Sequence, residues 1–148
     1  MKIKMFVASL AVALMSAANA GVVVDVPVEI DFDEQFAAGN MLTARYSKNE
    51  SEQIGCGMRT YAATPEGAPA FTFGFCQARI SEEESVICYT FDNAELTQQI
   101  QSLADNSFVT FRWDENNDCT YIGSSTQSQY IMFSKDEKKA RKKRDKDN

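Results

Sequence analysis

The stretch from Phe71 to Phe91, FTFGFCQARISEEESVICYTF, constrains the fold more than any other part of the chain. Counting inward from its two ends places Cys76 opposite Cys88, with a turn centred near Glu82. One face of such a hairpin is aromatic, and the other carries small residues and cysteines. This alternation is typical of two antiparallel strands with one buried face. The sequence therefore predicts a β-hairpin here.

The first 20 residues have the three parts of a secretory signal peptide. Lys2 and Lys4 precede an apolar run from Met5 to Met15, and an A-x-A site predicts cleavage between Ala20 and Gly21. The apolar run is too short to cross a bilayer core of about 30 Å as a helix, and no later stretch is long enough. We expect no transmembrane segment and an exported protein, either periplasmic or extracellular.

Four cysteines follow the signal peptide: Cys56, Cys76, Cys88 and Cys119. An even number in a small exported protein indicates two disulfides, and no pair has the C-x-x-C spacing of thiol oxidoreductases or zinc ribbons. Cys76 faces Cys88 in the predicted hairpin, but Cys56 also faces Cys76 if the preceding turn is centred on Glu66. We favour Cys76–Cys88 with Cys56–Cys119, because the second bridge closes a long loop and constrains the unfolded chain most.

Acidic and basic residues are unevenly distributed. Residues 21–134 include seventeen acidic and five basic side chains, whereas residues 135–148 include four acidic and eight basic ones. The acidic part is unsuited to nucleic acid or an anionic membrane surface. The segment 134–148 is expected to be a charged, disordered tail, although its basic side chains could contact an anionic surface.

Histidine is absent from the chain. Its absence removes Ser-His and Cys-His nucleophilic catalysis and every histidine-ligated metal site. Asp114, Asn116 and Asp118 have the spacing that opens a calcium loop, but Cys119 and Ser125 occupy the diagnostic glycine and glutamate positions, so we interpret them as a hairpin turn. We expect no catalytic residue, no cofactor and no metal.

Residues after the hairpin predict one helix. Asp92 is suited to cap it. Its apolar positions recur at helical spacing and form one narrow face: Leu96, Ile100, Leu103 and Ala104. We expect this helix to lie across the aromatic face of the hairpin.

Three further strands are predicted over 54–62, 107–113 and 119–125, and residues 124–133 are interpreted as a final edge strand. The fold class is α+β: an antiparallel sheet of about five strands with one packed helix, held by disulfides. The predicted domain covers residues 54–133.

The chain before this domain is predicted to consist of the signal peptide, 1–20, and an acidic N-terminal arm, 21–53, in which Pro27 limits the extended chain to an edge strand or an arm.

The aromatic side chains are interpreted as a hydrophobic core. This set comprises Phe71, Phe73, Phe75, Tyr89, Phe91, Phe108, Phe111, Trp113 and Tyr121. Trp113 lies beside the polar turn, and it is the aromatic residue that we expect to be partly exposed on a binding surface.

Several motifs between residues 54 and 131 resemble a family of small exported bacterial four-cysteine proteins of unknown function. These motifs are IGC at Cys56, the spacing of Cys76 and Cys88, and the runs SFVTFRW, DENNDCTYI and SSTQSQYI. The resemblance implies a fold and a compartment, and no activity.

The sequence thus favours a small exported binding protein that is not an enzyme and whose partner is a protein or envelope component. The first alternative is a periplasmic inhibitor or immunity-type protein, which suits the size, acidity and disulfides. The second is a hydrolase without histidine that uses paired carboxylates, although the sequence singles out no two of them.

Overall fold

The structure, a computed structural model, describes residues 22–131, so the expected signal peptide and basic tail lie outside the described residues. A four-stranded antiparallel sheet has the order β1-β2-β6-β7, with β1 (Glu29–Asp31), β2 (Phe36–Asn40), β6 (Phe108–Trp113) and β7 (Cys119–Ser125). A three-stranded antiparallel sheet has the order β3-β4-β5, with β3 (Gln53–Tyr61), β4 (Phe71–Arg79) and β5 (Ser85–Tyr89). The helices are α1 (Met41–Arg45) and α2 (Ala94–Gln101), and a 3-10 turn covers Ser128–Tyr130.

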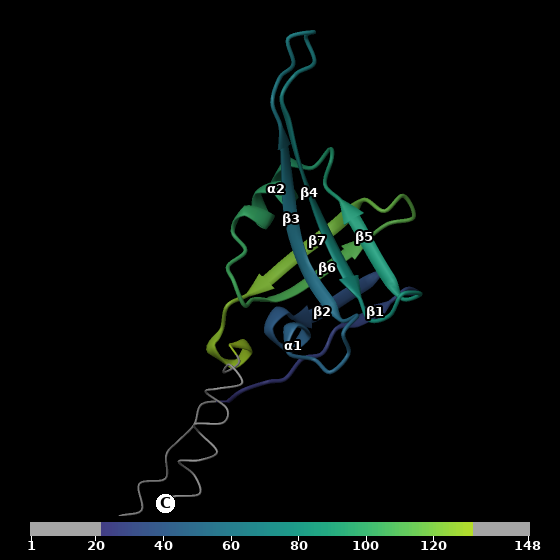
Figure 1. The fold of residues 1–148 in the computed structure, drawn as a ribbon, viewed down its shortest axis with the longest axis vertical. Coiled ribbons are helices and arrows are strands. Elements are labelled where there is room, and N and C mark those ends of the chain that lie inside the picture. Colours follow the sequence, from purple (N-terminus) through teal and green to yellow (C-terminus); the bar gives the residue numbers. More distant parts are fainter. Residues whose placement is uncertain (1–21, 132–148) are drawn as a thin grey trace, which may run out of the picture.

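The two sheets lie one over the other with their strands crossing, as Figure 1 shows. The core between them is built from buried side chains of both sheets, among them Ala37, Ile54, Cys76, Ala78, Val109, Phe111 and Ile122. Val109, Phe111 and Trp113 share the buried face of β6, as their spacing predicts. In the described part of the chain, no helix is long and apolar enough to cross a membrane.

The predicted hairpin and its register are confirmed. Cys76 pairs with Cys88 across β4 and β5, and Cys56 pairs with Cys76 across β3 and β4. Both turns therefore lie where the counting places them. Strand β7 has the predicted bounds. The final edge strand expected over 124–133 is wrong within the described residues, because the chain after β7 forms the 3-10 turn.

Residues 21–53 were expected to be an arm outside the domain, but those described contribute two strands and a helix to it. Strand β2 pairs with β6 along its whole length, and β1 pairs with β2 at the sheet edge. Ala37 and Ala38 are buried, and the Val28 amide donates to Glu52 Oε1 at 2.8 Å. The described residues thus hold seven strands and two helices rather than about five strands and one helix.

Helix α2 packs on the opposite face of the hairpin from the one expected. Its N-cap is Asn93, not Asp92, because the Asn93 side chain accepts a hydrogen bond from the Leu96 amide at 2.9 Å. The buried Ile100 side chain lies against Gly74, and a Cβ at Gly74 would clash with Ile100 Cδ1. The helix therefore uses the space that small residues leave on the inner face of β4, and the aromatic face stays uncovered by it.

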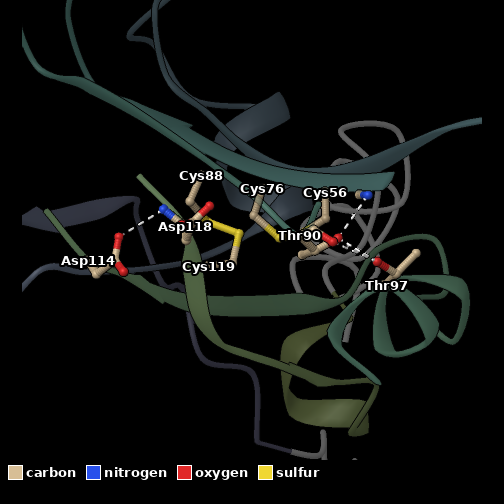
Figure 2. The surroundings of a disulfide bond; sticks show 9 residues. Cys56, Cys76, Cys88, Thr90, Thr97, Asp114, Asp118 and Cys119 are labelled. Carbon is tan, nitrogen blue, oxygen red and sulfur yellow. Dashed lines mark hydrogen bonds between the residues drawn. A yellow bond between two sulfur atoms is a disulfide. The ribbon is translucent and has the colours of Figure 1, made fainter. Parts of the chain in front are cut away.

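Both disulfides differ from the favoured pairing. The bonds are Cys56–Cys76, with Cα atoms 4.0 Å apart, and Cys88–Cys119, with Cα atoms 5.0 Å apart. Figure 2 shows that the four cysteines lie close together. Cys56, Cys76 and Cys88 share the inner face of one sheet, so Cys76 has two neighbours in register. Because Cys119 approaches Cys88 from the other sheet, Cys76 pairs with Cys56.

Replacing Ile100 by alanine should lower the free energy of unfolding by about 2 to 5 kcal/mol, because it removes a buried side chain and leaves a cavity beside Gly74. Gln98 is exposed on the same helix, so Gln98→Ala should change that free energy by less than about 0.5 kcal/mol. Urea denaturation of the two variants measures the contrast. Equal losses at the two positions would contradict the packing of α2.

Replacing Cys88 and Cys119 together by alanine should lower the free energy of unfolding by about 2 to 5 kcal/mol. It should cost more than the same double substitution of Cys56 and Cys76, because Cys88–Cys119 joins the two sheets whereas Cys56–Cys76 lies within one sheet. Thermal denaturation of both double variants tests this order. A greater loss from the Cys56 and Cys76 pair would contradict it.

Candidate binding surface

The outward face of the three-stranded sheet carries six aromatic rings. In a strand, alternate side chains point to opposite faces, and β4 is buried at every second residue from Gly74 to Ala78. The residues between them and their cross-strand partners therefore point away from the core. This set, called the aromatic face below, comprises Tyr61, Phe71, Phe73, Phe75, Tyr89 and Phe91.

Five rings of the aromatic face, all except Phe75, contact one another in a continuous row. The ring centroids of Tyr61 and Phe71 are 4.9 Å apart and nearly parallel, and those of Phe73 and Phe91 are 4.6 Å apart. Tyr89 continues the row, 5.1 Å from Phe91. Despite these contacts the face remains open to solvent, since Tyr61, Phe71 and Phe91 are 53%, 50% and 53% exposed.

The expectation that the aromatic residues form the core is wrong for most of them. Phe111 and Trp113 are buried, whereas Phe71, Phe91 and Tyr121 are each about half exposed. The core side of β4 is instead made of small residues, which leave room for α2 and the other sheet but none for large rings.

Trp113 does not provide the binding surface expected of it, because it is only 6% exposed. Its ring packs against Phe111, at a centroid distance of 5.8 Å, and edge-on against Phe32, at 6.2 Å. Its place beside the polar turn suggested exposure, but its side chain points to the buried face of β6.

Phe75 covers the backbone of the neighbouring strand. Its ring lies so close to Gly57 that a Cβ there would be 2.8 Å from Phe75 Cζ. The guanidinium carbon of Arg59 lies 5.0 Å from the centroid of the same ring, within the range of a cation–π contact. Gly57 therefore allows the ring to lie flat on the sheet, and Arg59 is held beside the aromatic face.

Charge on the outward face has the opposite sign to that of the domain. The outward positions of β3, β4 and β5 hold no aspartate or glutamate, but they hold Arg59 and Arg79. Arg79 Nε donates to the Ser51 carbonyl at 3.1 Å, and Arg59 Nη1 donates to the Met58 carbonyl at 2.8 Å. The remaining donors of both guanidinium groups are available to carboxylates of a partner.

The far end of the β3–β4 hairpin projects beyond the rest of the molecule, as Figure 1 shows. Every residue from Arg59 to Thr72 is exposed, and we call this segment the finger. Its tip is closed by a hydrogen bond from the Thr64 amide to the Ala68 carbonyl, at 3.0 Å. Gly67 has a φ of 98°, which favours glycine. Glu66 is the one charged side chain between Arg59 and Arg79.

Several carboxylates have structural roles. Asp114 Oδ1 accepts from the amides of Asn116 and Asp118, at 2.9 and 3.0 Å, so the segment considered as a calcium loop is a hairpin turn (Figure 2). Glu52 accepts from Val28, and Asp31 accepts from Glu34. Within residues 22–131, no group of three or more aspartate, glutamate, cysteine or histidine side chains could hold a metal ion.

Comparisons of the chain with family models, with curated proteins and with solved structures found no match.

Replacing Phe71 and Phe91 together by serine should lower the free energy of unfolding by about 1.5 to 3 kcal/mol, because both rings are half exposed and each loses about half of the free energy of a fully buried Phe. The same variant should bind less of a fluorescent dye that reports exposed apolar surface. Phe111 is fully buried, and Phe111→Ala should cost about 3 to 5 kcal/mol. Urea denaturation compares the two variants, and a larger loss from the serine pair would show that the aromatic face is part of the core.

Proposed function

We propose that this chain is a small exported binding protein, not an enzyme, and that its aromatic face binds a protein partner with an apolar, acidic surface. The observation that carries this proposal is the row of stacked rings exposed on a folded sheet. A fully buried Phe or Tyr removes about 150 to 250 Å² from water, so each half-exposed ring leaves roughly 100 Å² accessible. The three most exposed rings together reach roughly 300 Å², the size of the largest, often functional, patch on a typical monomer.

The charged residues on the outward face of the β3-β4-β5 sheet indicate which kind of partner surface would bind there. The domain is strongly acidic, with seventeen acidic and five basic residues between positions 21 and 134. Two of those five, Arg59 and Arg79, lie on the outward face of the β3-β4-β5 sheet, which has no carboxylate at its outward strand positions. Basic residues of a partner would have no carboxylate acceptor at these strand positions, whereas carboxylates of a partner would accept hydrogen bonds from the two guanidinium groups. An apolar surface with acidic residues at its rim is complementary to this arrangement.

The stacking of the rings favours a protein over a carbohydrate. Sugars pack against the flat face of an aromatic ring, but Tyr61 and Phe71 cover each other's faces, and Phe73 lies nearly parallel to both. The ring edges that remain accessible form an apolar ridge. Such a ridge fits side chains of another protein, for which aromatic residues and arginine are the enriched contacts.

Export is supported by the signal-peptide pattern and by the two disulfides, which persist in oxidising compartments. Membership of the exported four-cysteine family that the motifs resemble would place the chain in the same compartment.

The projecting finger favours an inhibitor as the second candidate function. A narrow exposed hairpin can enter a cleft of a partner enzyme, and the finger carries mostly small or apolar residues with Glu66 as its tip charge. The hydrolase alternative has less support, because Glu52 and Asp114 are hydrogen-bonded to backbone amides.

Site-specific photo-cross-linking in the cells that produce the protein tests the proposal. A photoreactive residue at Phe71 or Phe91 should yield a protein adduct. The same residue at Tyr121, which is 47% exposed on the other sheet, should not. Arg59→Glu should lower the adduct yield at Phe91 roughly tenfold, whereas Arg112→Glu, the same charge reversal at an exposed position of the other sheet, should leave it unchanged.

Three results would contradict the proposal: equal adducts at Tyr121, adducts of lipid or glycan instead of protein, or no effect of Arg59→Glu. Adducts formed through Ala68 at the tip, but not through Phe91, would favour the inhibitor instead.

A further inference from the structure

Strand β3 is the edge of its sheet, and its free side has a defined hydrogen-bonding pattern. The sheet order β3-β4-β5 gives β3 one strand neighbour. In an antiparallel pair, opposite residues alternate between exchanging hydrogen bonds and directing their N–H and C=O groups to the other side. The residues of β3 whose N–H and C=O groups point to the free edge determine what that edge can bind.

Two observations identify the residues whose backbone N–H and C=O groups point to the free edge. The Thr90 amide donates to the Gly74 carbonyl at 2.9 Å, so the backbone N–H and C=O groups of Gly74 point to β5. Met58 is opposite Gly74 on β3, and its N–H and C=O groups therefore point away from β4. The Cα atoms of Cys56 and Cys76 are 4.0 Å apart, the closer spacing of a pair that exchanges no backbone hydrogen bonds. By alternation, Cys56, Met58 and Thr60 direct their N–H and C=O groups to the free edge.

Within residues 22–131, no hydrogen bond uses the N–H of Cys56, Met58 or Thr60. The Met58 carbonyl accepts from the Arg59 side chain. The opposite edge of the sheet differs, because the Tyr89 amide on β5 donates to the Asn117 carbonyl at 2.9 Å. One edge is thus closed by the chain itself and the other is open.

Strand β3 also lacks the features that protect an edge from pairing. It is nine residues long and contains no proline, and Arg59 is its one charged residue. Edge strands that must stay unpaired are usually short, interrupted by proline or rich in charge. A long, nearly uncharged edge is a template for another strand.

A cavity of about 240 Å³ lies beside this edge. Its lining is mostly apolar and comes from β3, from the start of α1, and from α2 and the residues after it: Met41, Cys56, Gly57, Met58, Ile100, Leu103, Ala104 and Asp105. Met58 is on the inner face of β3, so the cavity lies under the edge. An added strand would direct every second side chain toward it.

We propose that the free edge of β3 binds an extended segment of a partner polypeptide as an added strand, with an apolar side chain in the cavity. Alternating N–H and C=O groups at strand spacing are a chemistry that only extended polypeptide matches along the edge. A second copy pairing through β3 would form the ladder without filling the cavity, because the inward side chains of that strand, Ile54 and the disulfide-bonded Cys56, are held in its own core. This site is distinct from the aromatic face and does not depend on it.

Amide hydrogen exchange of the isotope-labelled full chain, followed by NMR, is the first test. The N–H groups of Cys56, Met58 and Thr60 should exchange roughly 100-fold faster than those of Gly55 and Gly57, which bond to β4. Slow exchange at all three would show that the edge is already covered and would overturn the proposal. A dimer in size-exclusion chromatography with that slow exchange would assign the edge to a second copy instead.

The second test adds a capped seven-residue peptide of alternating threonine and valine at millimolar concentration. Exchange at the three edge amides should slow at least threefold, with chemical-shift changes at Met41 and Leu103. A twin peptide with N-methyl groups at alternate residues cannot form the ladder and should have no effect. Equal effects of the two peptides, or none from either, would overturn the proposal.

Met58→Pro removes an edge donor without removing a bond to β4, so it should abolish the peptide effect while the chain still folds, with a lower melting temperature because the Met58 side chain packs against the core. If that variant does not fold, Thr60→Pro at the exposed end of β3 serves the same purpose. Phe71→Ser is the control for the aromatic face and should leave peptide binding at the edge unchanged. A peptide effect that survives the proline substitution would contradict the assignment to this edge.

Discussion

Close packing on the inner face of β4 determines the rest of this structure. Gly74, Cys76 and Ala78 are small, and all three are buried. The absence of a side chain at Gly74 admits Ile100 of α2, and the inner face also holds Cys88, which bonds to Cys119 of the opposite sheet. Since the space between the layers is filled by small residues and sulfur, the large rings of the same strands have to lie on the outside.

The same packing explains which features the sequence could predict. Strand positions and register depend on local alternation and on turn chemistry, so the hairpin, both turns, β6 and β7 could be located by counting. Which face of the hairpin is buried depends on the opposing layer, and aromatic rings are ordinarily the better core residues. The correct signal was the small size of Gly74 and Ala78, which indicates a close approach.

Disulfide pairing and the domain boundary depend on contacts between distant segments. Cys76 is in register with two cysteines, so local counting could not separate Cys56 from Cys88 as its partner. The choice depends on where Cys119 approaches, which is a property of how the sheets stack. The N-terminal segment is likewise predicted to be an acidic arm, because its pairing with the distant strand β6 leaves no local signal in the sequence. The projecting finger and the free edge could not be found from patterns within single strands, because both are defined by what does not pack against β3 and β4.

The two sheets therefore have different roles. The four-stranded sheet supplies most of the large buried side chains, including Phe111 and Trp113, whereas the three-stranded sheet presents the aromatic face, the finger and the open edge. A binding edge must remain extended without its partner, since ordering it on binding would reduce affinity. Cys56–Cys76 joins the edge strand to the central strand at a residue whose N–H group points to the free edge. Cys88–Cys119 fixes the same sheet to the core, so the two disulfides together hold the proposed binding surfaces in place before any partner arrives.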